Sequence, residues 1–272
     1  MNQLKQTLQQ LSQQVREKAS HLFSSRSRRG QSLIELALVL PILIVILLGI
    51  VEVAIYIGRY LDILDLTREA ARFASVRDPF TMANLADVDC AEAEPFNFYY
   101  HTACIFSPPG DTDVCQAGHP LYSYYEKFCN GLNTYVQINP QRDDILISVF
   151  TIGNKNPTGS PIIGVTNTWP SPNGYWALSD NDADTNYNSN WRTDCKGNII
   201  IDHPYYTASR VEESLSQSAT MNKGFVAVEF YYCYEQALNL PFLSQFVPNP
   251  IRIHAYTLMP LPAAAPTATP EP

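Results

Sequence analysis

The sequence predicts an α+β protein: a long N-terminal membrane-spanning helix followed by an extracytoplasmic antiparallel-sheet domain with disulfide-stapled loops. Three observations predict this class. Residues 33–57 form an almost uninterrupted apolar segment, all six cysteines follow that segment, and runs rich in β-branched and aromatic residues lie in the second half of the chain. A helix that precedes a series of strands is typical of an α+β arrangement.

The apolar segment has the length of a membrane span. Residues 36–51 carry no charge, and only Glu35 and Glu52 interrupt residues 33–57. A helix needs about 20 apolar residues to cross the hydrocarbon core. A cleaved secretory signal is the competing interpretation, but such a signal has a shorter apolar region and ends in an A-x-A pattern, and no such pattern closely follows Val51. The segment therefore predicts a transmembrane helix over residues 31–57, with a kink at Pro41, which removes one backbone hydrogen bond.

The charges predict the orientation of this helix. The first 30 residues hold six basic side chains and one acidic side chain, a net charge of +5, whereas the remaining residues hold 12 basic and 25 acidic ones, a net charge of −13. Positive flanks stay on the cytoplasmic side. We expect a single-pass protein of the cytoplasmic membrane, in contact with membrane lipid, with its N-terminus inside and its C-terminal domain outside. An acidic domain also argues against nucleic acid as a partner.

The cysteines favour disulfides over a metal site. None of the six forms a C-x-x-C pair, although zinc ligands usually occur in closely spaced pairs. An even number of cysteines in an exported segment is typical of disulfides, and six cysteines allow fifteen connectivities. The candidates are Cys90, Cys104, Cys115, Cys129, Cys195 and Cys233.

The residues before the apolar segment form a recognisable signal. Two arginines precede Gly30, and Glu35 stands at the fifth position after it, at the start of the apolar run. This arrangement resembles the class III signal of type IV prepilins, which implies cleavage by a prepilin peptidase between Gly30 and Gln31. The cut would free an α-amino group on Gln31. Glu35 can then pair with that amine on a neighbouring subunit, because two opposite charges leave water together at a lower cost than either alone.

The resemblance extends to the TadE-like family of the tight-adherence (Flp pilus) system. It covers about 50 residues and rests on the sequences GQSLIELALVLPILIVILLGIVEVA and TREAARFAS. A weaker similarity to the same family lies near the C-terminus. The matching features are Gly30, Glu35, residues 37–41, Gly49, Glu52 and the arginines of residues 68–72. The resemblance implies a minor pseudopilin whose partners are other pilins, pseudopilins and pilus assembly proteins. It also implies that Glu35 and Glu52 act in pairing between subunits, and that the protein is associated with a pilus.

The rest of the chain divides by composition. Residues 1–30 read as a basic cytoplasmic leader, residues 58–78 as an extension of the helix, and residues 79–260 as the α+β domain. Strands are expected at residues 144–152, 224–235 and 250–258, with a short one at 198–202 and a short helix at 122–132. Residues 153–196 read as a long surface insertion, and residues 261–272 as a disordered Pro/Ala tail.

No motif for catalysis or cofactor binding rises above background. Asp180, Asp182 and Asp184 begin like a calcium loop, but Thr185 and Trp191 replace the glycine and the bidentate glutamate that such a loop needs. They are a weak calcium candidate; otherwise we expect no metal, no cofactor and no enzymatic activity. Two alternatives to the pseudopilin stay open: an uncleaved membrane-anchored binding or adhesion domain, and a membrane-anchored enzyme without a familiar motif.

Overall fold

The structure is a computed structural model. It describes the backbone of residues 2–120, 122–133, 136–139, 141–180, 189–215, 223–239 and 247–262, and the side chains of these residues from Leu33 onward, Tyr124 excepted. Two compact units make up the chain, Met1–Ala54 and Ile55–Pro272. The predicted Pro/Ala tail lies outside the described residues, apart from its first two positions.

One helix, α1 (Asn2–Ser75), includes the predicted leader, the apolar segment and the predicted extension. The predicted transmembrane helix over residues 31–57 and its extension over residues 58–78 are thus continuous with helical residues that precede them. Gly30 does not end it, since an isolated glycine costs a helix only about 1 kcal/mol. Pro41 lies inside α1 without ending it, and its predicted kink stays a prediction.

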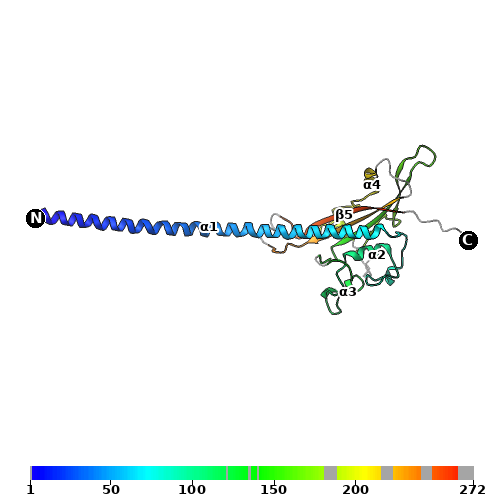
Figure 1. The fold of residues 1–272 in the computed structure, drawn as a ribbon, viewed down its shortest axis with the longest axis horizontal. Helices are drawn as coiled ribbons and strands as arrows, with labels where there is room; N and C mark the ends of the chain where they lie inside the picture. Colours follow the sequence, from blue (N-terminus) through cyan, green and yellow to red (C-terminus); the bar gives the residue numbers. More distant parts are fainter. Residues whose placement is uncertain are drawn as a thin grey trace. The chain divides into compact units, whose positions relative to one another are not determined.

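Five antiparallel strands form the sheet of the second unit (Figure 1). They are β1 (Asp144–Asn154), β2 (Ile163–Trp169), β3 (Trp176–Ala177), β4 (Gly224–Tyr234) and β5 (Ile251–Leu261). The order is β2-β1-β4-β5, and β3 pairs with β1 beyond the end of β2. Ile147 lies opposite Val228, and Val228 opposite Thr257, which fixes the register of the three long strands. The three long strands confirm those expected from the β-branched runs.

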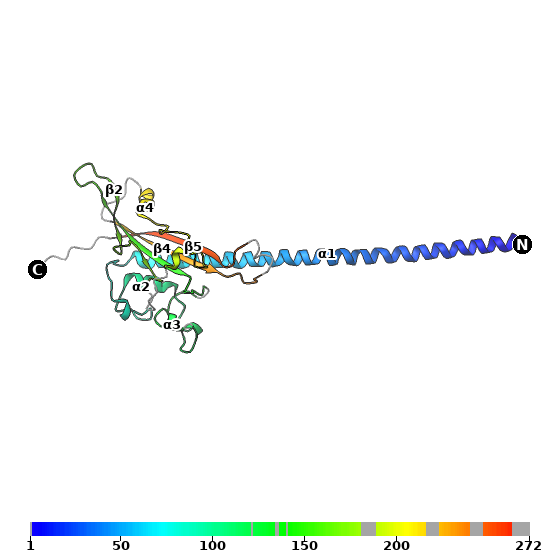
Figure 2. The same cartoon turned by 180° about the vertical axis from the view of Figure 1, so that it is seen from behind.

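Both faces of the sheet are covered, and this explains why β1 and β4 are apolar on both sides. Ile145, Ile147, Val226 and Val228 pack on one face with residues 55–75 of α1 and with α2 (Phe98–Ala103). Small side chains at Ala70, Ala71 and Ala74 line the helix there and are fully buried. The other face packs against α4 (Ala208–Ser214) and Trp191. Figures 1 and 2 show α4 on one side of the sheet and α2 on the other.

Three disulfides join the six cysteines: Cys90–Cys104, Cys115–Cys129 and Cys195–Cys233. The first two hold the irregular region between α1 and β1, which otherwise contains α2, α3 (Tyr122–Tyr125) and the short 3-10 helices Leu85–Asp87, Cys104–Phe106 and Asp113–Cys115. The third ties the segment after the 3-10 helix Asn190–Arg192 to β4. The predicted disulfide-stapled loops are therefore confirmed.

Three expectations about local structure are wrong. Residues 153–196 are not only a surface insertion: they contain β2 and β3 and contribute the buried Trp176 and Trp191 to the core. Residues 198–202 form no strand, but only a single bridge between Thr193 and Ile199. The helix expected at 122–132 ends at Tyr125. In each case the segment is too short or too polar for a periodic pattern to develop.

We predict that the double substitution Cys195→Ala/Cys233→Ala lowers the free energy of unfolding of the second unit by about 4 kcal/mol. The disulfide closes a loop with a sequence separation of 38 residues, and losing it restores chain entropy to the unfolded state. All three tryptophans, at positions 169, 176 and 191, lie in this unit, so tryptophan fluorescence in a denaturant titration of the detergent-solubilised chain reports its unfolding. A change of less than about 1 kcal/mol would contradict the structural role of this bridge.

Candidate functional site

The apolar stretch of α1 is the first functional feature. Within the described residues, Leu33–Ser75 is long and apolar enough to cross a membrane, and few residues of its most apolar stretch are buried. Leu36, Ile42 and Ile50 are 59%, 54% and 62% exposed. A soluble protein rarely exposes a continuous apolar surface of this size. The helix therefore suggests membrane anchoring.

The two carboxylates predicted to act in assembly, Glu35 and Glu52, both lie on this stretch but differ in solvent exposure. Glu35 is exposed, whereas Glu52 is 6% exposed. Seventeen residues separate them, which corresponds to about 25 Å along a helix, so they do not form one site. Gly30 and Gln31 lie within α1, and their side chains are outside the described residues.

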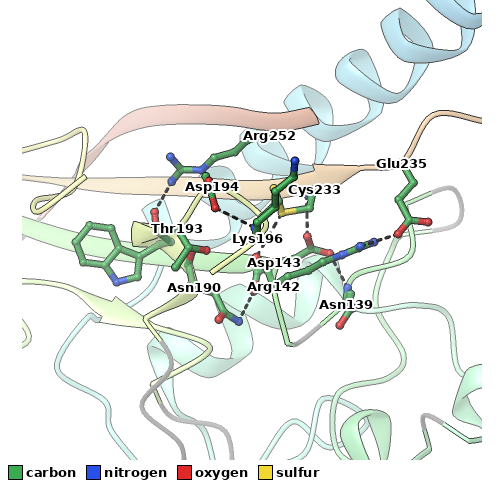
Figure 3. The surroundings of a disulfide bond; sticks show 12 residues. Asn139, Arg142, Asp143, Asn190, Thr193, Asp194, Lys196, Cys233, Glu235 and Arg252 are labelled. Atoms are coloured by element: carbon green, nitrogen blue, oxygen red, sulfur yellow. Dashed lines mark hydrogen bonds and ion pairs between the residues drawn. A yellow bond between two sulfur atoms is a disulfide. The ribbon is translucent and has the colours of Figure 1, made fainter. Parts of the chain in front are cut away.

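A buried polar network surrounds the Cys195–Cys233 disulfide (Figure 3). The Asp143 carboxylate accepts hydrogen bonds from the backbone N–H groups of Cys233 at 2.8 Å and of Asn139 at 2.6 Å. Next to it, Arg142 forms an ion pair with Glu235 at 2.6 Å. Asn190 Nδ2 donates to the carbonyl oxygen of Asp143 at 3.3 Å. Asp143 therefore connects the start of β1 to the disulfide-bonded end of β4.

Asp144 continues this network on the other side of the strand. Its carboxylate accepts hydrogen bonds from Ser179 N–H and Oγ–H, at 3.0 and 2.6 Å, and from Trp191 N–H at 3.0 Å. Burial raises the pKa of Asp143 to about 7 and that of Asp144 to about 6, despite the hydrogen bonds that act in the opposite direction. No sequence pattern singled out this pair, because the partners are backbone N–H groups that only the fold brings together.

Glu229, in the middle of β4, is a third buried carboxylate of the second unit. It accepts hydrogen bonds from the backbone N–H groups of Tyr205 and Tyr206, from the Tyr231 hydroxyl at 2.6 Å and from His254 Nε2 at 3.1 Å. Burial acts to raise the pKa of Glu229, but the hydrogen bonds from His254, Tyr206 and Tyr231 outweigh it and hold the pKa below its ordinary value. This arrangement fastens the segment before α4 to the sheet, which is a structural role.

The weak calcium candidate is tested only in part. Asp180 Oδ1 accepts hydrogen bonds from Ser189 N–H and Oγ–H, at 2.9 and 3.1 Å, while Asp182 and Asp184 lie outside the described residues. Among the described residues, no group of three or more His, Cys, Asp or Glu side chains could hold a metal ion.

The fold and these sites define a class of protein: one N-terminal apolar helix suited to membrane anchoring carries an α+β domain that three disulfides cross-link. Within that class, residues 30–72 match the family model of the TadE-like protein, as the sequence resemblance predicted. The match implies involvement in the tight-adherence pilus system. It ends inside α1 and does not include the sheet. No curated protein and no solved structure matches the chain.

We predict that acidification stabilises the second unit through Asp143. The folded-state pKa of about 7 lies above the ordinary aspartate value of 3.8, so ionisation of this buried carboxylate opposes folding at high pH, and stability is regained as the pH falls through 7. Lowering the pH from 8 to 5 should therefore add about 3 kcal/mol more to the unfolding free energy of the wild type than to that of Asp143→Asn. Denaturant titrations at each pH measure this difference. An identical pH slope for the two proteins would contradict the raised pKa.

Proposed function

We propose that this protein is a minor pseudopilin that takes part in assembly of a tight-adherence type IV pilus. The observation that carries the proposal is the match of residues 30–72 to the TadE-like family model, on a helix whose apolar side chains the chain itself leaves uncovered. Such a helix can lie in lipid before assembly and against the helices of other subunits afterwards. Its partners are then pilins, pseudopilins, the assembly proteins of the pilus and a prepilin peptidase.

The charges and the disulfides support the proposed topology. The basic N-terminal residues favour the cytoplasmic side, and three disulfides are typical of a domain folded outside the cytoplasm. The role is structural in this proposal, and the chain is not an enzyme. Substrate turnover that a single polar substitution in residues 80–260 abolishes would contradict this part.

A second candidate is an uncleaved, membrane-anchored binding or adhesion domain. It is favoured by the helical backbone on both sides of the predicted cut, since α1 runs without interruption through Gly30 and Gln31. A peptidase needs an extended backbone at the bond it cuts, so this helix must open locally before cleavage.

We expect the protein isolated from cells to begin at Gln31. Gly30→Leu should block the cut, because a large side chain at the position before it obstructs close approach of the peptidase to the backbone. Gly49→Ala is the matched control, since an added Cβ there meets no atom within 4 Å. N-terminal sequencing and intact mass measure both. A wild-type chain that retains residues 1–30 would support the uncleaved anchor instead.

We expect Glu35→Gln to leave membrane insertion intact and to reduce pilus assembly at least about tenfold. The amide keeps the size of the side chain but removes the negative charge that pairs with the α-amino group of a neighbouring subunit. Glu69→Gln, at an exposed position of α1, is the control and should assemble normally. Membrane fractionation and the yield of sheared pili provide the two measurements. Equal yields from both variants would exclude the pairing role of Glu35.

A further inference from the structure

A cleft of about 740 Å³ lies in the second unit, where α1 ends. Its walls come from the end of α1 and the residues after it, the Cys90–Cys104 disulfide, residues 91–94, and residues 130–132. This volume is within the range of about 300–1,000 Å³ that is usual for ligand-binding clefts. Nothing in the network around Asp143 and Asp144 contributes to it.

The cleft combines an apolar lining with an acidic rim. Phe73, Phe96, Ile105 and Leu132 supply apolar surface, and Leu132 is 58% exposed. Three exposed acidic residues, Asp78, Glu92 and Glu94, lie in the lining of the cleft. Arg77 is the one Lys or Arg in that lining, so negative charge predominates there. The Arg77 guanidinium lies 3.4 Å from the Phe73 ring centroid and donates to the Phe73 carbonyl oxygen at 3.0 Å. No ion pair joins it to these carboxylates in the described part of the chain, so the rim stays available to a cation.

The walls of the cleft are held in place by the fold. His101 Nε2 lies 3.0 Å from the Glu92 carbonyl oxygen, and Cys90 N–H donates to the Lys127 carbonyl oxygen at 2.9 Å. The Cys90–Cys104 disulfide ties the acidic segment to the end of α2. A cleft that is already formed binds a partner without the entropy cost of ordering its walls.

An exposed segment of complementary character lies elsewhere on the same unit. We name residues 196–200 the tip; it carries Lys196 together with Ile199 and Ile200, which are 66% and 54% exposed. Asp194 holds the tip by accepting hydrogen bonds from the backbone N–H groups of Lys196 and Asn198, both at 3.0 Å. The adjacent Cys195–Cys233 disulfide anchors it to β4, and Lys196 stands beside this bridge in Figure 3.

A chain cannot place its tip in its own cleft. The Tyr56 ring contacts the Tyr234 ring at 5.4 Å, so the β4 end next to Cys233 lies near residue 56 of α1, while the cleft begins at Phe73, about 25 Å further along the helix. Trp191 and Tyr231, on the side of the tip, pack on the sheet face opposite to α1. Tip and cleft thus lie at opposite ends and on opposite faces of the unit.

We propose that the tip of one copy of this chain docks in the cleft of a second copy. Lys196 faces Glu92 and Glu94 in this contact, and Ile199 and Ile200 cover Ile105 and Leu132. Because two different surfaces meet, the contact is heterologous, and successive copies form a ring or an open chain, depending on whether the rotation between them closes. The contact uses the second unit alone, so it adds to the α1-based assembly proposed above and does not depend on it.

The test is self-association of the full chain in detergent micelles, measured by sedimentation equilibrium. We expect Lys196→Glu, and separately Glu92→Lys/Glu94→Lys, to lower the association constant at least about tenfold, because each places like charges in contact. Lys223→Glu and Asp111→Lys/Glu126→Lys change the net charge equally at exposed positions outside both surfaces and should associate like the wild type.

Mixing the two disruptive variants gives the decisive result. Each supplies the partner that the other lacks, so an equimolar mixture of Lys196→Glu and Glu92→Lys/Glu94→Lys should regain the association that both lose alone. The head-to-tail contact is overturned if the wild type stays monomeric, if the disruptive variants associate like their controls, or if the mixture fails to associate. The yield of pili from cells separates this contact from the proposed function. If any of these results is found while the pilus yield is normal, the contact between tip and cleft is excluded and the proposed function is not.

Discussion

The apolar surface of residues 33–53 is the constraint on which the rest of the structure depends. These side chains lie on a helix that the chain itself does not cover, so lipid or the helices of other subunits must shield them from water. The same helix continues into the second unit, where Ala70, Ala71 and Ala74 let it approach the sheet closely. The anchoring element is thereby also a core element of the folded domain.

The domain compensates for its irregular segments with cross-links and buried carboxylates. Long stretches between α1 and β1, and between β2 and β4, have little regular structure, and disulfides fasten both. Asp143, Asp144 and Glu229 accept hydrogen bonds from backbone N–H groups of neighbouring segments. A buried carboxylate with several such donors stabilises a loop in the way that a helix cap stabilises a helix end. These acidic residues are therefore structural supports.

The sequence predicted the parts that follow from local periodicity. The apolar helix and strands β1, β4 and β5 come from long runs whose spacing is unambiguous, and the cysteines indicated disulfides. The pairing of the cysteines, the buried positions of Trp176 and Trp191, and the roles of Asp143 and Glu229 depend on contacts between residues far apart in the chain. Short elements such as β3 and α2 carry too few residues for a period to show. The cleft, similarly, combines residues that lie far apart in the chain.

Protease accessibility in right-side-out membrane vesicles tests whether α1 anchors the chain with its domain outside. With that orientation, added protease should degrade the domain after reduction of its disulfides, while any unprocessed chain should keep an N-terminal fragment that contains residues 1–57 protected by the membrane. A protected domain, or digestion of the basic N-terminal residues in sealed vesicles, would contradict the orientation on which the proposed assembly role depends.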